Sequence, residues 1–100
     1  MDESEVLKFE QQQRITKLSQ AIREGAKLRP QCIGYGDYDG ALCAIQAAQL
    51  AVLGRITSGP GRWAADYFGV PVVTVIDCYI DNDLGMTREA IADRLEAIGY

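Results

Sequence analysis

Histidine is absent from the sequence. This absence excludes Ser–His and Cys–His nucleophilic systems, histidine general bases and the commonest zinc ligand. Cysteine is scarce, and Cys32, Cys43 and Cys78 form no C-x-x-C motif. Because each of them lies among apolar neighbours, we expect three reduced, buried thiols in a cytoplasmic protein. We expect no catalytic residue, no metal site and no cofactor.

Long apolar runs and an excess of basic residues are also missing. The longest strongly apolar stretch, residues 70–76, is far too short to span a bilayer, so we expect no membrane partner. Fourteen acidic residues outnumber ten basic ones, which leaves a formal net charge of −4. Non-specific nucleic-acid binding depends on lysine and arginine. The charge balance therefore disfavours direct nucleic-acid binding and favours a protein partner with a basic surface.

The glycine-rich stretch GYGDYDGALCAI, residues 34–45, suggests at first a phosphate-binding loop. Its glycines are spaced one residue too widely for G-x-G-x-x-G, and it lacks the lysine and hydroxyl residue of the Walker loop. Asp37 and Asp39 would also repel a phosphate. We therefore interpret the stretch as a turn in which Asp39 caps a helix beginning at Ala41.

A second acidic cluster comprises Asp77, Asp81, Asn82 and Asp83. An EF-hand loop needs an oxygen ligand at position 5, glycine at position 6 and glutamate at position 12. Counted from Asp81, those positions hold glycine, methionine and alanine, so the calcium motif fails. We interpret the cluster as a polar turn that precedes a helix capped by Thr87.

Apolar spacing predicts one domain, residues 1–100, with a mainly α fold of four to five helices. The predicted helices cover residues 5–28, 41–53, 62–68, 73–81 and 88–98. The alternative is an α+β fold with one short hairpin or strand pair near 31–43 and 72–77, because residues 72–76 are rich in β-branched side chains. Trp63 and Tyr67 are expected to face the core.

The last predicted helix has the clearest pattern. Ile91, Leu95 and Ile98 fall on one apolar face, and Arg88 belongs to the charged faces around it. Thr87 is a favoured N-cap residue, and Gly99 is placed to end the helix.

Three segments carry a resemblance to known sequences. IREGAKLRPQ (22–31), CAIQAA (43–48) and IDNDLGMTREAIADRLE (80–96) resemble a group of small uncharacterised proteins encoded by phages, prophages and bacteria. The chain departs from that group at Gln46, where glycine is common, and lacks the tryptophan or histidine often found near the Asn-Asp turn. The resemblance implies a mostly helical fold, which favours a helix over residues 73–81. It implies a phage or mobile-element setting and no activity.

The acidity and the resemblance together predict a non-enzymatic inhibitor that binds a host protein in the host cytoplasm. Its most concrete form is an anti-CRISPR or other anti-defence inhibitor that engages a basic nucleic-acid-binding surface. Electrostatic complementarity would direct such binding. The candidate contact residues share a carboxylate and lie in the two acidic clusters: Asp37, Asp39, Asp77, Asp81 and Asp83.

Two other classes of function stay open. A small DNA-binding or transcription-regulatory protein would use the basic residues of the first helix, Lys17, Arg23, Lys27 and Arg29. A metal-dependent or thiol enzyme is the less favoured alternative. The sequence is compatible with a monomer or a homodimer.

Overall fold

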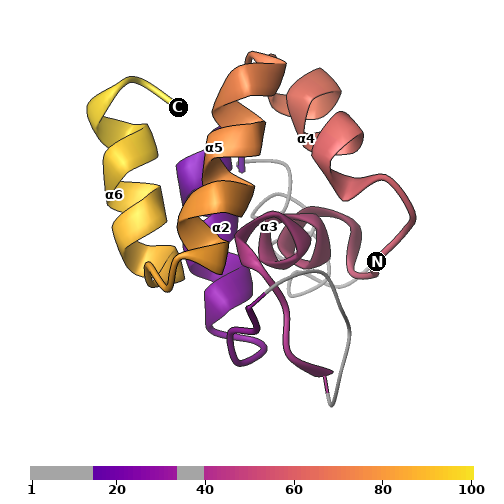
Figure 1. Ribbon diagram of the computed structural model, residues 1–100. Coiled ribbons are helices and arrows are strands. Elements are labelled where there is room, and N and C mark those ends of the chain that lie inside the picture. Colours follow the sequence, from indigo (N-terminus) through magenta and orange to yellow (C-terminus); the bar gives the residue numbers. More distant parts are fainter. Residues whose placement is uncertain (1–14, 34–39) are drawn as a thin grey trace, which may run out of the picture.

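A computed structural model describes residues 15–33 and 40–100 of the chain. Within these ranges it contains five α-helices (Figure 1). Their bounds are α2 (Leu18–Ala26), α3 (Ala44–Leu53), α4 (Pro60–Phe68), α5 (Val72–Asp83) and α6 (Arg88–Ala97). The prediction of a mainly α fold is therefore confirmed. None of the helices in the described ranges is long and apolar enough to cross a lipid bilayer.

The α+β alternative is wrong in both of its segments. Residues 72–77 lie inside α5. Near 31–43, the described residues form a single isolated bridge between Gln31 and Leu42, and it is parallel, whereas a hairpin would be antiparallel. Within residues 15–33 and 40–100 no strand is available to pair with this segment, so its β-branched side chains are accommodated in a helix, where tertiary packing overrides propensity.

The core forms where α2 packs against α3 and α6. Leu18 and Ile22 of α2 and Ile45 of α3 are completely buried, as the apolar spacing predicts. Gly25 of α2 faces the backbone of Ala47 of α3, and a Cβ atom added at Gly25 would lie 1.8 Å from the Ala47 carbonyl oxygen. A glycine at this position therefore sets how closely the two helices approach.

The start of α3 differs from the prediction. The helix begins at Ala44 and its N-cap residue is Cys43, so capping by Asp39 before a helix start at Ala41 is wrong. The side chain of Gln46 reaches back, and its Oε1 accepts a hydrogen bond from the Cys43 backbone N–H at 3.3 Å. This glutamine is the N3 residue of a capping box at the start of α3. Asp37 and Asp39 themselves lie outside the described residues.

The acidic segment after residue 80 also differs. Asp81, Asn82 and Asp83 form the last turn of α5 and are not a polar turn, since the helix ends at Asp83. Pro71 starts α5, and its carbonyl accepts hydrogen bonds from the N–H groups of Thr74 and Val75. Proline before the first turn suits a helix start, because its missing N–H is not needed there.

The N-cap of α6 is confirmed, because Thr87 Oγ1 accepts a hydrogen bond from the Ala90 N–H at 3.1 Å. Ile91 and Leu95 are buried as predicted, but Ile98 lies beyond the helix end and is exposed. Arg88 was expected on a charged, solvated face, and it is instead buried. On α4, Tyr67 is about half exposed rather than turned to the core.

Candidate protein-interaction surface

Helix α5 is apolar on two sides. Val75 and Cys78 are buried against the core, and Asn82 continues the same side. The opposite side, called here the α5 outer face, consists of exposed apolar residues: Val72, Val73, Ile76, Ile80 and Leu84. Four of these residues recur every fourth position, so their side chains stack along one line of the helix.

The α5 outer face is strongly exposed. Its five side chains have exposed fractions between 48% and 79%. Figure 1 shows α5 between α4 and α6, which pack against its flanks, and this leaves the outer face clear of the other described helices. A helix of a small soluble domain normally buries one apolar stripe and presents polar residues to water. A second apolar stripe on the surface is typical of an interaction site.

Three of the five candidate contact residues lie on α5. Asp77 and Asp83 are exposed and border the α5 outer face. Asp81 differs, because its carboxylate is mostly covered and forms an ion pair with the Arg94 guanidinium at 2.7 Å. Asp81 therefore joins α5 to α6, and the exposed acidic groups beside the apolar stripe are Asp77 and Asp83.

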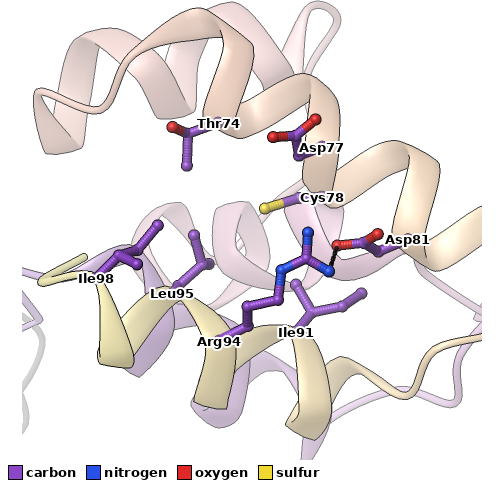
Figure 2. A pocket seen from close by; sticks show the side chains of 8 residues that line it. All are labelled: Thr74, Asp77, Cys78, Asp81, Ile91, Arg94, Leu95 and Ile98. Atoms are coloured by element: carbon purple, nitrogen blue, oxygen red, sulfur yellow. Dashed lines mark ion pairs between the residues drawn. The ribbon is translucent and has the colours of Figure 1, made fainter.

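A small pocket of about 60 Å³ opens between α5 and α6 (Figure 2). Thr74, Asp77 and Cys78 contribute to its α5 wall, and Leu95 and Ile98 contribute to the wall on the α6 side. The pocket thus combines apolar surface with one exposed carboxylate, and it borders the α5 outer face through Asp77.

Figure 2 shows how one end of this pocket is closed. Arg94 reaches from α6 across the gap to Asp81 on α5. The Arg94 Nη1 also lies 3.7 Å from the sulfur of Met86. The guanidinium of Arg94 therefore neutralises the carboxylate of Asp81, while no ion pair or side-chain hydrogen bond joins Asp77 to another described residue.

Asn82 fixes the end of α5 to the rest of the fold. Its side chain is buried, and its Oδ1 accepts hydrogen bonds from Gln31 Nε2 at 2.9 Å and from the Ala44 N–H at 3.2 Å. Its Nδ2 donates to the Cys32 carbonyl at 2.8 Å. One amide side chain thus satisfies an N–H of the first turn of α3 and holds the segment around residue 31.

Arg88 holds the other side of the same region. Its guanidinium donates hydrogen bonds to the backbone carbonyls of Arg29 at 2.6 Å, Leu42 at 3.4 Å and Ala26 at 3.5 Å. Burial lowers the pKa of this guanidinium. The carbonyl of Ala26 belongs to the last residue of α2, where the helix dipole favours a cation. Sequence reasoning missed Asn82 and Arg88 as anchors, since each falls in a segment of charged residues.

Two of the four basic residues proposed for DNA binding, Arg23 and Lys27, form ion pairs with acidic side chains. Arg23 on α2 lies against α6, and its guanidinium contacts the carboxylates of Glu89 at 3.1 Å, Asp93 at 2.6 Å and Glu96 at 2.8 Å. These hydrogen bonds to Asp93, Glu96 and Glu89 raise the pKa of Arg23. One positive charge is surrounded by three negative ones, so this part of the surface is acidic. Lys27 is paired with Glu24 at 3.0 Å.

No disulfide joins the three cysteines, and the prediction that they are buried holds for two of them. Cys43 and Cys78 are buried, and Cys32 is partly buried against the core. Burial raises the pKa of the Cys43 thiol and raises the pKa of the Cys78 thiol to about 12. A neutral thiol is a poor nucleophile. Residues 15–33 and 40–100 contain no group of three or more side chains of the metal-binding types placed to hold an ion.

No family model, curated protein or solved structure matches this chain. Its function is therefore argued from its own residues.

Proposed function

We propose that this protein acts without catalysis, as an inhibitor that binds a host protein through the α5 outer face. In its most concrete form it is an anti-CRISPR or other anti-defence inhibitor of a phage or mobile element. The target surface on the host protein combines apolar residues with the lysines and arginines of a nucleic-acid-binding site. The inhibitor acts in the host cytoplasm by occupying that site.

The observation that carries this proposal is the unpartnered apolar stripe on α5 between two exposed carboxylates. Val73, Ile76 and Ile80 expose apolar area to water. Covering this area with another surface is energetically favourable, because apolar surface is then removed from water. Asp77 and Asp83 border the stripe and repel nucleic acid, but they attract a basic protein surface. Apolar contacts supply affinity here, while the carboxylates supply orientation and speed of association.

Charge also distinguishes among occupants of this face. If two copies packed with their α5 outer faces together, Asp77 and Asp83 of one copy would approach the same residues of the other. Like charges brought together with little water between them repel strongly. A basic partner avoids this repulsion, so the arrangement favours a different protein over a second copy.

The first experiment measures inhibition and binding together. The tagged protein is expressed in bacterial strains that each carry one defined CRISPR–Cas type, phage plating is counted, and captured proteins are identified and purified. We expect phage plating to rise in at least one strain and the captured component to bind the purified protein directly. The double variant Ile76→Ser/Ile80→Ser should weaken that binding about tenfold or more, because truncating a central apolar contact costs over about 1 kcal/mol.

Matched controls keep the result specific. Leu28→Ser changes an exposed apolar residue outside α5 and should leave binding and plating unchanged. Asp77→Lys and Asp83→Lys should slow association at low salt, whereas Asp66→Lys on α4 should not. Equal binding by the Ile76/Ile80 variant and the original protein would contradict the proposal.

Sedimentation velocity distinguishes binding of a different protein to the α5 outer face from self-association through that face. We expect a monomer whose mass does not change with the Ile76/Ile80 substitution. A dimer that the substitution dissociates would assign the face to a second copy. A shortened chain lacking residues 1–14 should bind the partner as well as the full chain does, and markedly tighter binding after shortening would assign the face to that segment.

A further inference from the structure

We infer that the pocket between α5 and α6 receives a long cationic side chain, lysine or arginine, from the partner that covers the α5 outer face. This inference rests on the proposed function and names the chemistry of the partner at one point of the contact. Its basis is the composition of the pocket wall and the position of Asp77 between the pocket and the apolar stripe.

The shape and composition of the pocket match such a side chain. Its volume of about 60 Å³ is too small for a drug-sized ligand and suits part of one side chain. Cys78, Leu95 and Ile98 contribute apolar surface, against which the methylene groups of lysine or arginine can lie. Thr74 and Asp77 contribute oxygen atoms on the α5 wall, and a cationic head group can donate hydrogen bonds to both (Figure 2).

The charge of the pocket selects a cation. The lining carries two carboxylates, Asp77 and Asp81, and one guanidinium, Arg94, so its net charge is −1. The Arg94 ion pair with Asp81 leaves Asp77 as the carboxylate without an ion-pair partner among the described residues. A partner's ammonium or guanidinium restores neutrality, whereas a carboxylate would meet repulsion from Asp77 and an apolar side chain would leave the charge unpaired.

The position of the pocket links it to the α5 outer face. Asp77 follows Ile76 directly and lies one turn after Val73, so the stripe and the pocket share an edge. Ile98, more than half exposed, extends apolar surface on the far side of the pocket. A segment of the partner that covers Val73 and Ile76 therefore passes the pocket mouth and can insert one side chain.

Small-molecule probes test the pocket without the partner. Four blocked amino acids are titrated into the isotope-labelled protein and followed by NMR: the N-acetyl methylamides of arginine, lysine, norleucine and glutamate. We expect arginine or lysine to shift the amide signals of Asp77, Cys78, Leu95 and Ile98. Norleucine and glutamate should bind more weakly, by about 1.4-fold to fivefold for norleucine, since an exposed ion pair contributes about 0.2–1 kcal/mol. Comparison of the two cationic probes identifies which head group the pocket prefers.

Substitutions test whether the carboxylate of Asp77 causes the preference for cationic probes. Asp77→Asn should weaken binding of the cationic probes by about 1.4-fold to fivefold and leave binding of norleucine unchanged. Asp66→Asn should alter neither. Equal binding of norleucine and the cationic probes, or unchanged binding after Asp77→Asn, overturns the inference. The Ile76→Ser/Ile80→Ser variant should still bind the probes. The proposal for the pocket and the proposal for the α5 outer face can therefore be contradicted independently.

Discussion

Gly25 of α2 packs directly against the backbone of Ala47 of α3, where a Cβ atom on Gly25 would lie 1.8 Å from the Ala47 carbonyl oxygen. The obstructing atoms belong to the backbone, so no side-chain rotation can make room. Gly25→Ala should therefore destabilise the fold by about 3 kcal/mol or more, at or above the upper end of overpacking costs. Urea unfolding measures the change.

The sign of that change is the decisive readout. In a helix exposed to solvent, glycine to alanine is stabilising by about 0.5–1 kcal/mol. A Gly25→Ala protein as stable as the original, or more stable, would show that α2 and α3 do not pack this closely.

Arg88 is predicted to be the most important cation for stability. Replacing it with methionine keeps most of the packing but leaves the carbonyls of Arg29 and Leu42 without their charged donor. The Leu42 carbonyl keeps its hydrogen bond from the Cys32 N–H. We therefore expect Arg88→Met to cost about 1.5–3 kcal/mol, in line with hydrogen bonds to charged groups. Thermal and urea unfolding provide the measurement.

Two comparisons control for the loss of an arginine. Arg62→Met removes an exposed i,i+4 pair with Asp66 and should change stability by no more than about 0.5 kcal/mol. Arg88→Lys keeps the charge but loses the branched donor geometry, so its stability should fall between the original and Arg88→Met. Similar losses for Arg62→Met and Arg88→Met would contradict the role assigned to Arg88.

Asn82 is predicted to hold three segments together. Asn82→Leu should destabilise the protein by about 2–4 kcal/mol, because it leaves the Ala44 N–H and the Cys32 carbonyl without their shared partner. Amide hydrogen exchange should rise at Cys32 and Ala44 in particular. Gln20→Leu, an exposed polar-to-apolar change on α2, should leave both protection and stability close to the original values. Uniform loss of protection in both variants would refute this anchoring.

The Arg23 cluster predicts a salt-dependent stability. Arg23→Gln removes the positive charge that Glu89, Asp93 and Glu96 surround and leaves three carboxylates facing one another. The melting temperature should fall at low salt. Part of the loss should be recovered at about 1 M salt, where the Debye length is about 3 Å. A decrease that is identical at low and high salt would contradict an electrostatic origin.

Cys78 predicts a loss of stability at alkaline pH. Its pKa is raised from 9.0 to about 12 by burial and by the nearby Asp81 and Asp77 carboxylates. Between these two pH values the unfolded chain loses the thiol proton while the folded chain keeps it. The free energy of unfolding should therefore fall by about 1.4 kcal/mol per pH unit from this group as the pH rises.

Comparison with Cys78→Ala isolates that thiol from the tyrosines and lysines, which also titrate in this range. Cys78→Ala should be less stable near pH 7 because it leaves a small void. Its stability should decline less steeply above pH 9 than that of the original protein. Parallel pH profiles for the two proteins would show that the Cys78 thiol is accessible to water.

Much of the helical framework was predictable because its signals are local. The Thr87 cap depends on a side chain and an N–H group three residues away. Gly54 and Gly69 end α3 and α4 in the left-handed conformation that glycine adopts without strain. For α5 the local signals conflicted, since its β-branched residues favour a strand while the spacing of Val73, Ile76 and Ile80 also fits a helix. The structure exposes these three residues, and the buried side of α5 consists of Val75, Cys78 and Asn82.

The candidate site was predictable only in part. The sequence identified Asp77 and Asp83 as candidate contacts. The apolar stripe beside them could be recognised as a candidate interaction surface only from the exposure of its side chains, which no local sequence pattern predicts. Asp81 differs from Asp77 because Arg94, on another helix, lies within reach of its carboxylate. The spacing of acidic residues alone does not tell an ion-paired carboxylate from an exposed one.

The sequence by itself determined a mainly helical chain, an acidic surface and three thiols that do not pair, because these follow from composition, spacing and capping. Only the tertiary structure decided that Arg88 and Asn82 are buried anchors, that Arg23 faces α6, and that α5 keeps one apolar side uncovered. The reason is physical: burial and pairing depend on contacts between residues far apart in the chain, and such contacts exist only after the helices have packed.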